Sequence, residues 1–261
     1  MSGVLTGKVA IITGAGQGIG EAIALRLAQD GASIGIIDLD TSKAESVADK
    51  IRAFGVGART ATCDVSDRDQ LHAAVAEIET ALGGFDIMIN NAGIAQVLPL
   101  LEVRSDDLER ITRINIGGVL WGIQAAAASF IERGIRGKII NACSIAAFLG
   151  QPVFGVYSST KFAVRALTQA AAQEYAQYGI TVNGYSPGTV GTDMWDEIDR
   201  ILADRSGVAV GESFRNQAHA AALGRPSTPD DVAGLVAFLA GPDSDYMTGQ
   251  SPLVDGGMLF N

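Results

Sequence analysis

Short runs of apolar residues alternate along this chain with longer segments in which apolar residues recur every three or four positions. Residues 9–13 and 33–38 are two such runs, rich in Ile, and residues 19–29 between them have the helical period. A continuous apolar run is typical of a parallel strand buried on both faces, and a helical crossover must connect two parallel strands. The N-terminal residues therefore predict a strand-helix-strand unit.

The same alternation continues to the end of the chain. Further strands are predicted at 58–63, 85–90, 138–143, 180–186 and 252–254, and further helices at 42–54, 67–82, 105–133, 156–178 and 229–239. Right-handed crossovers place such helices on both faces of the sheet. The pattern predicts an α/β fold, a doubly wound Rossmann-type parallel sheet of about seven strands, with the ligand crevice beyond the carboxyl ends of the strands.

The length and one irregular segment indicate the domain organisation. A chain of 261 residues fits one large domain, so residues 1–261 are predicted to form a single nucleotide-binding domain. Residues 192–223 are a long mixed segment between the last two strands and interrupt the alternation. Long segments of this kind often cover an active site, and we expect 192–223 to be a substrate lid.

Composition narrows the class of protein. With 48% hydrophobic and 18% charged residues the chain is too apolar for disorder. The 29 acidic residues exceed the 19 basic ones and give a net charge of -10, which disfavours nucleic acid and anionic membrane surfaces as partners. Cys63 and Cys143 are too few for a disulfide framework and lack zinc-type spacing, so we expect a cytoplasmic protein without a metal site.

The first predicted strand runs directly into a glycine-rich turn with the pattern T-G-x-x-x-G-x-G. Gly14, Gly18 and Gly20 permit tight turning and close approach of the backbone. The start of the following helix offers N–H groups and a positive dipole end to a pyrophosphate. Such a turn can also be a plain strand-helix connection, but its place after the first strand of an alternating chain favours dinucleotide binding.

Asp38 ends the second predicted strand, where a carboxylate receives the ribose hydroxyls of adenosine in dinucleotide-binding folds. A carboxylate there repels a 2′-phosphate, and Gln17 rather than a basic residue lies in the glycine-rich turn. Both positions favour NAD over NADP. The alternative is that Asp38 only caps the helix that follows.

Tyr157 and Lys161 are four residues apart in a predicted helix, which places both side chains on one face. A nearby ammonium group favours the phenolate, so we expect Lys161 to lower the pKa of Tyr157 and to make Tyr157 a proton donor to a carbonyl. Ser144 follows the strand at 138–143, and its hydroxyl is placed to bond the substrate oxygen. A surface Tyr-Lys pair and a serine that only caps a turn are the alternatives.

The order and spacing of several motifs resemble those of the short-chain dehydrogenases/reductases across nearly the whole chain. The motifs are Thr13-Gly14-(x3)-Gly18-x-Gly20, Asn90-Asn91-Ala92-Gly93, Asn115, Ser144, Tyr157-(x3)-Lys161 and Pro187-Gly188-(x3)-Thr192. The resemblance implies that Tyr157 is the general acid/base, that Ser144 orients the carbonyl and that Lys161 holds the nicotinamide ribose. It also implies that Asn115 holds a water molecule that links Lys161 to solvent.

The same resemblance implies an NAD(H) site that follows the crevice from the adenine to the carboxamide. Asp64 and Val65 would lie at the adenine, although Asp64 is also a candidate cap for the helix at 67–82. The implied cofactor residues are Gly14, Gln17, Gly18, Ile19, Gly20, Asp38, Asp64, Val65, Asn91, Ala92, Gly93, Tyr157, Lys161, Pro187, Gly188, Val190 and Thr192.

Stretches outside the catalytic motifs, such as residues 121–125 and 246–261, resemble the acetoin reductase and 2,3-butanediol dehydrogenase branch of that family. This implies reduction of diacetyl or acetoin by NADH and the reverse oxidation. Trp195 is expected to cover a small substrate or, alternatively, to pack the lid onto the body. The expected small-ketone pocket comprises Ser144, Ile145, Gln151, Ile94, Gln96, Met194 and Trp195.

Other functions stay open at this point. A related dehydrogenase could act on a sugar alcohol, another secondary alcohol or a 3-oxoacyl substrate. A nucleotide-binding regulator without activity is an alternative of another class, which the presence of Ser144, Tyr157 and Lys161 disfavours. The family resemblance also implies a homotetramer built through the helices at 105–133 and 156–178, although the small residues 125–129 suit packing within one chain as well.

Overall fold

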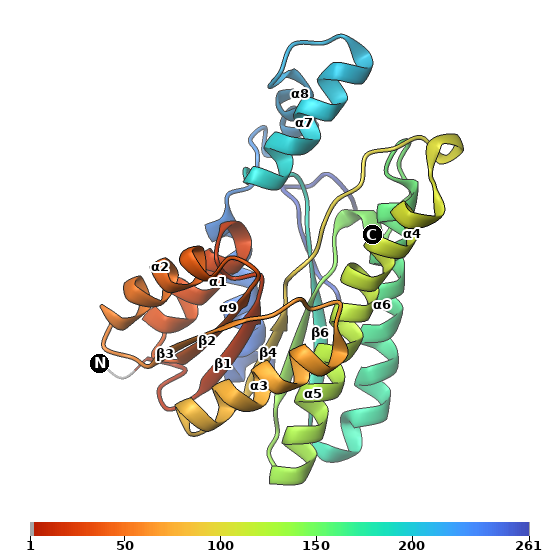
Figure 1. Cartoon of the computed structure of the whole chain (residues 1–261). Coiled ribbons are helices and arrows are strands. Elements are labelled where there is room, and N and C mark those ends of the chain that lie inside the picture. The colour runs from red at the N-terminus through yellow and green to blue at the C-terminus, as the bar shows by residue number, and fades with distance from the viewer. Residues whose placement is uncertain (1–2, 261) are drawn as a thin grey trace.

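The computed structural model describes residues 3–260, so residues 1, 2 and 261 of the predicted domain lie outside the described part. Its centre is a seven-stranded sheet in the order β3-β2-β1-β4-β5-β6-β7 (Figure 1), and every neighbouring pair is parallel. The strands are β1 (Val9–Thr13), β2 (Ser33–Asp38), β3 (Ala58–Thr62), β4 (Ile87–Asn90), β5 (Lys138–Ala142), β6 (Thr181–Pro187) and β7 (Leu253–Val254). Each strand lies within two residues of its predicted bounds.

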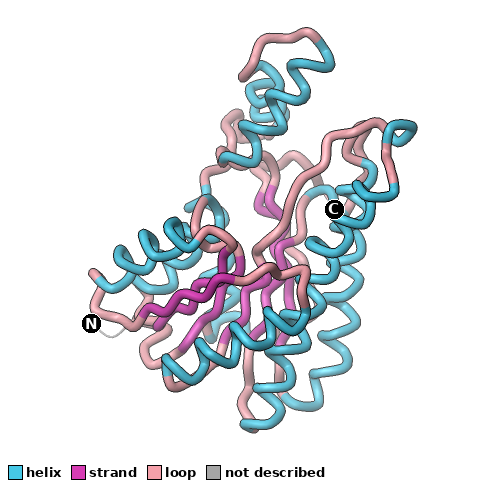
Figure 2. The backbone as a smooth tube through the Cα atoms, in the orientation of Figure 1, coloured by secondary structure: helices cyan, strands magenta, loops and turns pink. Residues whose placement is uncertain are grey.

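Helices cover both faces of the sheet (Figure 2). One face carries α1 (Gly18–Gln29), α2 (Thr41–Arg52) and α9 (Pro229–Ala240); the other carries α3 (Arg68–Leu82), α4 (Ser105–Thr112), α5 (Gly118–Arg133) and α6 (Gly155–Tyr175). This arrangement confirms the predicted doubly wound Rossmann-type fold in a single domain. Short 3-10 helices are η1 (Leu100–Glu102), η3 (Ile145–Ala147), η4 (Ala176–Tyr178) and η5 (Pro242–Ser244).

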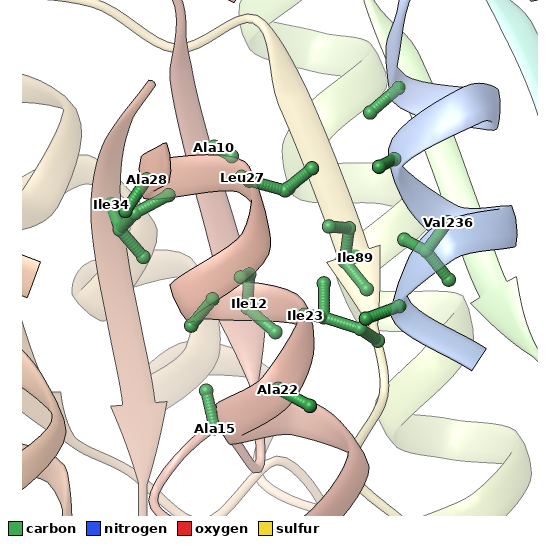
Figure 3. Close-up of a cluster of buried hydrophobic side chains, with 14 of the residues drawn as sticks. Ala10, Ile12, Ala15, Ala22, Ile23, Leu27, Ala28, Ile34, Ile89 and Val236 are labelled. Atoms are coloured by element: carbon green, nitrogen blue, oxygen red, sulfur yellow. The ribbon is translucent and has the colours of Figure 1, made fainter. Parts of the chain in front are cut away.

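The central strands are apolar at consecutive positions because both of their faces are buried. Ile12 of β1 packs with Ile23 of α1 and Val236 of α9 on one face (Figure 3). Its neighbour Ile11 belongs to the core on the other face, together with Ile78 of α3. Successive side chains of a strand point to opposite faces, so the two cores together require the uninterrupted Ile runs seen in the sequence.

The helix predicted at 105–133 contains an irregularity that the sequence did not reveal. Between α4 and α5, residues Arg113–Gly117 form one turn of π-helix, labelled η2. Such a turn contains one residue more than an α-helical turn and is frequent at functional sites. Asn115 is the buried residue of this turn.

The same helix, Ser105–Arg133, is the one helix within residues 3–260 that is long and apolar enough to cross a membrane by length and composition. Half of its most apolar window is buried inside the protein. Core helices meet this criterion too, and this helix packs against α3 and α6. Of the small residues 125–129, Ala125, Ala126 and Ala127 are buried within the single chain, whereas Ala128 is exposed and Ser129 is half-buried.

The segment 192–223 forms a helical hairpin that stands apart from the layered body (Figures 1 and 2). It consists of α7 (Asp193–Ser206) and α8 (Glu212–Ala220). At the base of the hairpin, Val190 and Ser227 form an isolated parallel bridge. The two ends of the segment are therefore held together beside the carboxyl end of β6.

Candidate active site

A cleft of about 470 Å³ runs along the carboxyl ends of the strands and beneath α7. Every residue predicted to contact the cofactor lines this cleft. It lies where doubly wound sheets bind their ligands, at the point where the strand order reverses between β1 and β4. Lining residues that the sequence analysis did not single out as site residues are Ile37, Leu39, Asp40, Lys43, Cys63, Ile114, Ala142, Cys143, Tyr185 and Asp193.

The glycine-rich turn has the shape that a pyrophosphate requires. Gly14 and Gly18 have φ angles of 63° and 59°, in the left-handed region that favours glycine. A Cβ atom at Gly20 would lie 2.2 Å from the carbonyl oxygen of Gly14, so no other residue fits there. No side chain caps the start of α1, which leaves its first N–H groups available to an anion. These residues fit a dinucleotide.

Asp38 supports the glycine-rich turn instead of capping the next helix. Its Oδ2 accepts a hydrogen bond from the backbone N–H of Gly16 at 2.8 Å, and its Oδ1 accepts one from Asp40 at 3.0 Å. The cap of α2 is Asp40, whose side chain accepts from the N–H groups of Ser42 and Lys43. The capping alternative for Asp38 was therefore wrong.

Asp64, which is expected to lie at the adenine, does not cap α3 either. The α3 cap is Asp67, which accepts from the N–H groups of Asp69 and Gln70. The Asp64 carboxylate accepts from the N–H of Ser66 at 2.9 Å, and Asp64 lines the cleft. The sequence pattern alone did not distinguish between these two aspartates.

Tyr185 of β6 is a buried residue of the site that the sequence analysis missed. Its hydroxyl donates a hydrogen bond to Oδ1 of Asn91 at 2.8 Å. The amide of Asn91 in turn donates to the carbonyl oxygens of Thr13 and Gly14, both at 2.9 Å. Tyr185 thereby fixes the end of β4 against the glycine-rich turn. A lone tyrosine in a buried strand carries no signal for this role.

Tyr157, Lys161 and Ser144 meet at one end of the cleft. Lys161 lies on α6 one turn after Tyr157, with its Nζ 5.7 Å from the centroid of the Tyr157 ring. The same Nζ donates to the carbonyl oxygen of Ala142, the last residue of β5, at 2.8 Å. Ser144 caps η3, since its Oγ accepts from the N–H of Ala146, and it also lines the cleft. The surface-pair alternative for Tyr157 and Lys161 was wrong because Lys161 is buried.

Burial dominates the pKa values of both groups. It lowers the pKa of Lys161 from its ordinary value of 10.5 to about 8, because the charged ammonium loses hydration. Burial also raises the pKa of Tyr157, and hydrogen bonding with Ser144 opposes this only in part. The expectation of a lowered pKa for Tyr157 was therefore wrong: loss of hydration outweighs the stabilisation of the phenolate.

Asn115 lies behind the cleft and does not line it. Its Oδ1 accepts from the N–H of Ile94 at 2.9 Å, and its Nδ2 donates to the Ile94 carbonyl at 2.9 Å and to Oγ1 of Thr160 at 3.1 Å. These bonds connect the π-helical turn, the loop after β4 and α6. The amide thus fixes Ile94 at the edge of the cleft.

The structure brings together only part of the predicted substrate pocket. Ser144, Ile94, Met194 and Trp195 line the cleft, whereas Ile145, Gln96 and Gln151 do not. Ile145 is buried within η3, so its side chain belongs to the body. Trp195 fits both alternatives, because it lines the cleft and its ring lies 5.9 Å from that of Phe214 in α8. Within residues 3–260, no three His, Cys, Asp or Glu side chains form a metal-binding group.

Comparisons with known proteins agree with this geometry. The family model for short chain dehydrogenases matches residues 8–202. The chain is 52% identical over 257 residues to L-2,3-butanediol dehydrogenase of Corynebacterium glutamicum, with 97% of this chain and 99% of the relative covered. It is 45% identical over 255 residues to the (S)-acetoin-forming diacetyl reductase of Staphylococcus epidermidis, with 97% and 99% covered.

Solved structures with bound NAD share the whole fold. A carveol dehydrogenase from Mycobacterium avium in complex with NAD matches with a TM-score of 0.94 and 30% identity, over 99% of this chain and 100% of the other. An NAD+-bound xylitol dehydrogenase matches with a TM-score of 0.90 and 33% identity, over 97% and 99%. The chain therefore belongs to the short-chain dehydrogenase family and is an NAD-dependent oxidoreductase.

Proposed function

We propose that this protein reduces diacetyl and acetoin with NADH to acetoin and 2,3-butanediol, and that it catalyses the reverse oxidation. One observation carries the proposal: Ser144, Tyr157 and Lys161 meet in a dinucleotide cleft whose substrate end is bordered by Trp195. The names of the two curated relatives supply the substrates, and both specify the L or S form. We propose that the alcohol carbon formed by this protein has the same S configuration.

Tyr157 gives its proton to the substrate carbonyl during reduction. Burial raises the pKa of Tyr157, so the phenol stays protonated at neutral pH and can act as a proton donor. Ser144 donates a hydrogen bond to the same carbonyl oxygen and fixes its orientation. When bound, NADH supplies the hydride to the carbonyl carbon. In the oxidation of an alcohol, Tyr157 takes the proton back.

Lys161 has two tasks in this mechanism. Its ammonium group holds the hydroxyls of the nicotinamide ribose, and its charge stabilises the phenolate that remains when Tyr157 has given up its proton. Because burial lowers the pKa of Lys161 to about 8, this charge is present at neutral pH and is lost in mildly alkaline solution. Asn115 acts indirectly, by holding Ile94 and α6 in place. The family resemblance also assigns it a water molecule, which would link Lys161 to solvent.

The hairpin formed by α7 and α8 is the proposed lid of the site, as expected for residues 192–223. Met194 and Trp195 of α7 border the cleft, so closure of this hairpin would exclude water from a small ketone. The protein is proposed to work in the cytoplasm, because both of its cysteines are free and buried.

The expected homotetramer is part of the proposal too. Because Ala125, Ala126 and Ala127 are buried within the chain, the interface would use the outer side of the 105–133 and 156–178 helices, where Leu108 and Phe162 are exposed. Light scattering after size-exclusion chromatography measures the assembly directly, and a monomer would remove this part of the proposal.

A sugar alcohol is the second candidate substrate, because the NAD+-bound xylitol dehydrogenase shares nearly the whole fold. Another secondary alcohol is open on similar grounds, since the carveol dehydrogenase also matches. A 3-oxoacyl substrate has no such support. The regulator without activity is no longer an alternative, because the family assignment identifies an oxidoreductase.

The test follows NADH absorbance while the purified protein is mixed with diacetyl or racemic acetoin and NADH or NADPH, and with 2,3-butanediol or xylitol and NAD+ or NADP+. Rapid NADH oxidation with diacetyl, slow reaction with NADPH and S products on chiral chromatography are expected. Faster turnover of xylitol with NAD than of 2,3-butanediol would move the assignment to sugar alcohols. A Tyr157→Phe variant with near-normal turnover would contradict the proposed proton donor.

A further inference from the structure

The proposed lid contains a buried carboxylate that the mechanism does not use. Asp199 on α7 is only 2% exposed, although α7 is otherwise rich in exposed charged residues. A buried carboxylate is costly unless hydrogen bonds replace its hydration. Both of its oxygens have such partners: Oδ2 accepts from the N–H of Gly211, and Oδ1 accepts from the N–H of Phe214 at 2.8 Å.

These two N–H groups belong to the beginning of α8. Gly211 precedes the helix with a φ of 88°, in the left-handed region, and has no side chain that could cap the helix. Phe214 lies in the first turn, where N–H groups lack partners within the helix and the helix dipole is positive. Asp199 therefore acts as the cap of α8 from the neighbouring helix and joins α7 and α8 into one unit.

Two aromatic rings connect the α7–α8 hairpin, which Asp199 holds together, to the substrate end of the cleft. Phe214 packs on Trp195 with ring centroids 5.9 Å apart and an interplanar angle of 58°. Trp195 precedes Asp199 by four residues, so both side chains project from one face of α7. Trp195 lines the cleft, and Asp199 does not. The path from Asp199 through Phe214 to Trp195 is thus continuous.

We propose that Asp199 is a positioning residue for the substrate: by holding the start of α8 against α7, it fixes Phe214 and keeps Trp195 over the bound ketone. The inference rests on the proposed function for the choice of ketone and for the role of the lid. Asp199 touches neither substrate nor cofactor. Its removal is expected to weaken substrate binding and to change the affinity for NADH little, because every predicted cofactor residue that lines the cleft lies outside α7 and α8.

The experiment compares Asp199→Asn with Asp204→Asn. Asp204 is an exposed carboxylate on the same helix, so the control makes the same change of charge without the two hydrogen bonds. The asparagine amide can accept a hydrogen bond through only one of its two terminal atoms. We expect the KM for diacetyl to rise about threefold to tenfold in Asp199→Asn, with kcat and the Kd for NADH close to those of the Asp204→Asn control. Asp199→Ala should show a larger rise.

A second readout follows Trp195 itself. The chain has 2 tryptophans, so a Trp121→Phe background leaves Trp195 as the single tryptophan reporter. Adding Asp199→Asn to this background should shift its emission to longer wavelength, because Trp195 loses its packing against Phe214 and gains contact with water. Adding Asp204→Asn should cause no such shift.

The outcomes separate this inference from the proposed function. If the parent protein turns over xylitol but not diacetyl, the substrate assignment fails, and the KM comparison is then made with xylitol. An unchanged KM and an unchanged Trp195 emission in Asp199→Asn would overturn the positioning role. A fall in kcat with no change in KM would overturn it as well, because such a result would place Asp199 in the chemical step.

Discussion

Lys161 is proposed to be required for activity, but the burial of its charge lowers the free energy of unfolding of the protein. Replacing Lys161 by methionine should abolish the first effect and remove the second. The lysine is 6% exposed, and burial lowers its pKa from 10.5 to about 8. A shift of this size corresponds to roughly 3 kcal/mol by which burial disfavours the charged form. Methionine fills a similar volume without a charge, but it loses the hydrogen bond to the Ala142 carbonyl, worth about 1 kcal/mol. Lys161→Met should therefore stabilise the cofactor-free protein by about 2 kcal/mol near neutral pH.

The sign of this effect depends on pH. Below about 8 the folded and unfolded chains both bind the Lys161 proton, so the full cost of burying the charge is present. Between about 8 and 10.5 the unfolded chain still binds the proton and the folded chain does not, so stability rises with pH. The advantage of Lys161→Met should thus shrink across this window and reverse above it, where the neutral amine keeps its hydrogen bond.

Urea unfolding of both proteins, followed by circular dichroism near pH 7 and near pH 10, measures this difference directly. Lys50→Met is the matched control, because Lys50 is exposed on α2 and is paired with Glu21. It should show no comparable dependence on pH. The reasoning is refuted if Lys161→Met is less stable than the parent protein at pH 7, or if the difference between them does not change with pH.

Three further predictions concern activity. Tyr157→Phe should lower kcat by roughly 10²- to 10⁴-fold, the usual contribution of a general acid, with NADH binding retained; a kcat within tenfold of the parent's would contradict this. Asp38→Ser should raise the kcat/KM for NADPH relative to that for NADH, because the carboxylate that repels a 2′-phosphate is removed. It should also weaken NADH binding, because the N–H of Gly16 loses its hydrogen bond to the carboxylate; tighter binding of both cofactors would show that the carboxylate does not support the glycine-rich turn. The ion pair between Arg205 of α7 and Glu102 of η1, at 2.8 Å, joins the lid to the segment between β4 and α4. Arg205→Glu should therefore raise the KM for diacetyl about two- to fivefold. Adding Glu102→Arg to this variant should restore the KM of the parent protein, and steady-state kinetics that show no such rescue would argue against a role for the ion pair.

The strands and the catalytic residues were predictable because each has a local signal. Strands buried on both faces must be apolar at consecutive positions, which is why Ile11 and Ile12 both mark β1. Tyr157 and Lys161 are spaced by one helical turn, and glycines reveal where the backbone needs a left-handed conformation. These signals lie within a few residues of one another, so the sequence alone contains them.

The features that escaped prediction depend on segments that are distant in sequence. Tyr185 forms a hydrogen bond with Asn91, which lies 94 positions away in the sequence, and Arg205 pairs with Glu102, which lies 103 positions away. The raised pKa of Tyr157 follows from burial, which no spacing reveals. Ile145 follows Ser144 directly yet does not line the cleft, because η3 places its side chain in the body.

The π-helical turn at Arg113–Gly117 limits the changes of length that this chain can tolerate at this point. A π-turn amounts to one residue inserted into an α-helix, and each residue of an α-helix turns the chain by about 100°. Deleting one residue here would give a more regular helix and leave α4 and α5 facing the core as before. Asn115 would then move away from Ile94 and Thr160, its three hydrogen bonds to these two residues would be lost, and Ile94 would no longer be held at the edge of the cleft. Substitutions of exposed residues near this turn are therefore expected to be tolerated better than a change in the length of the chain.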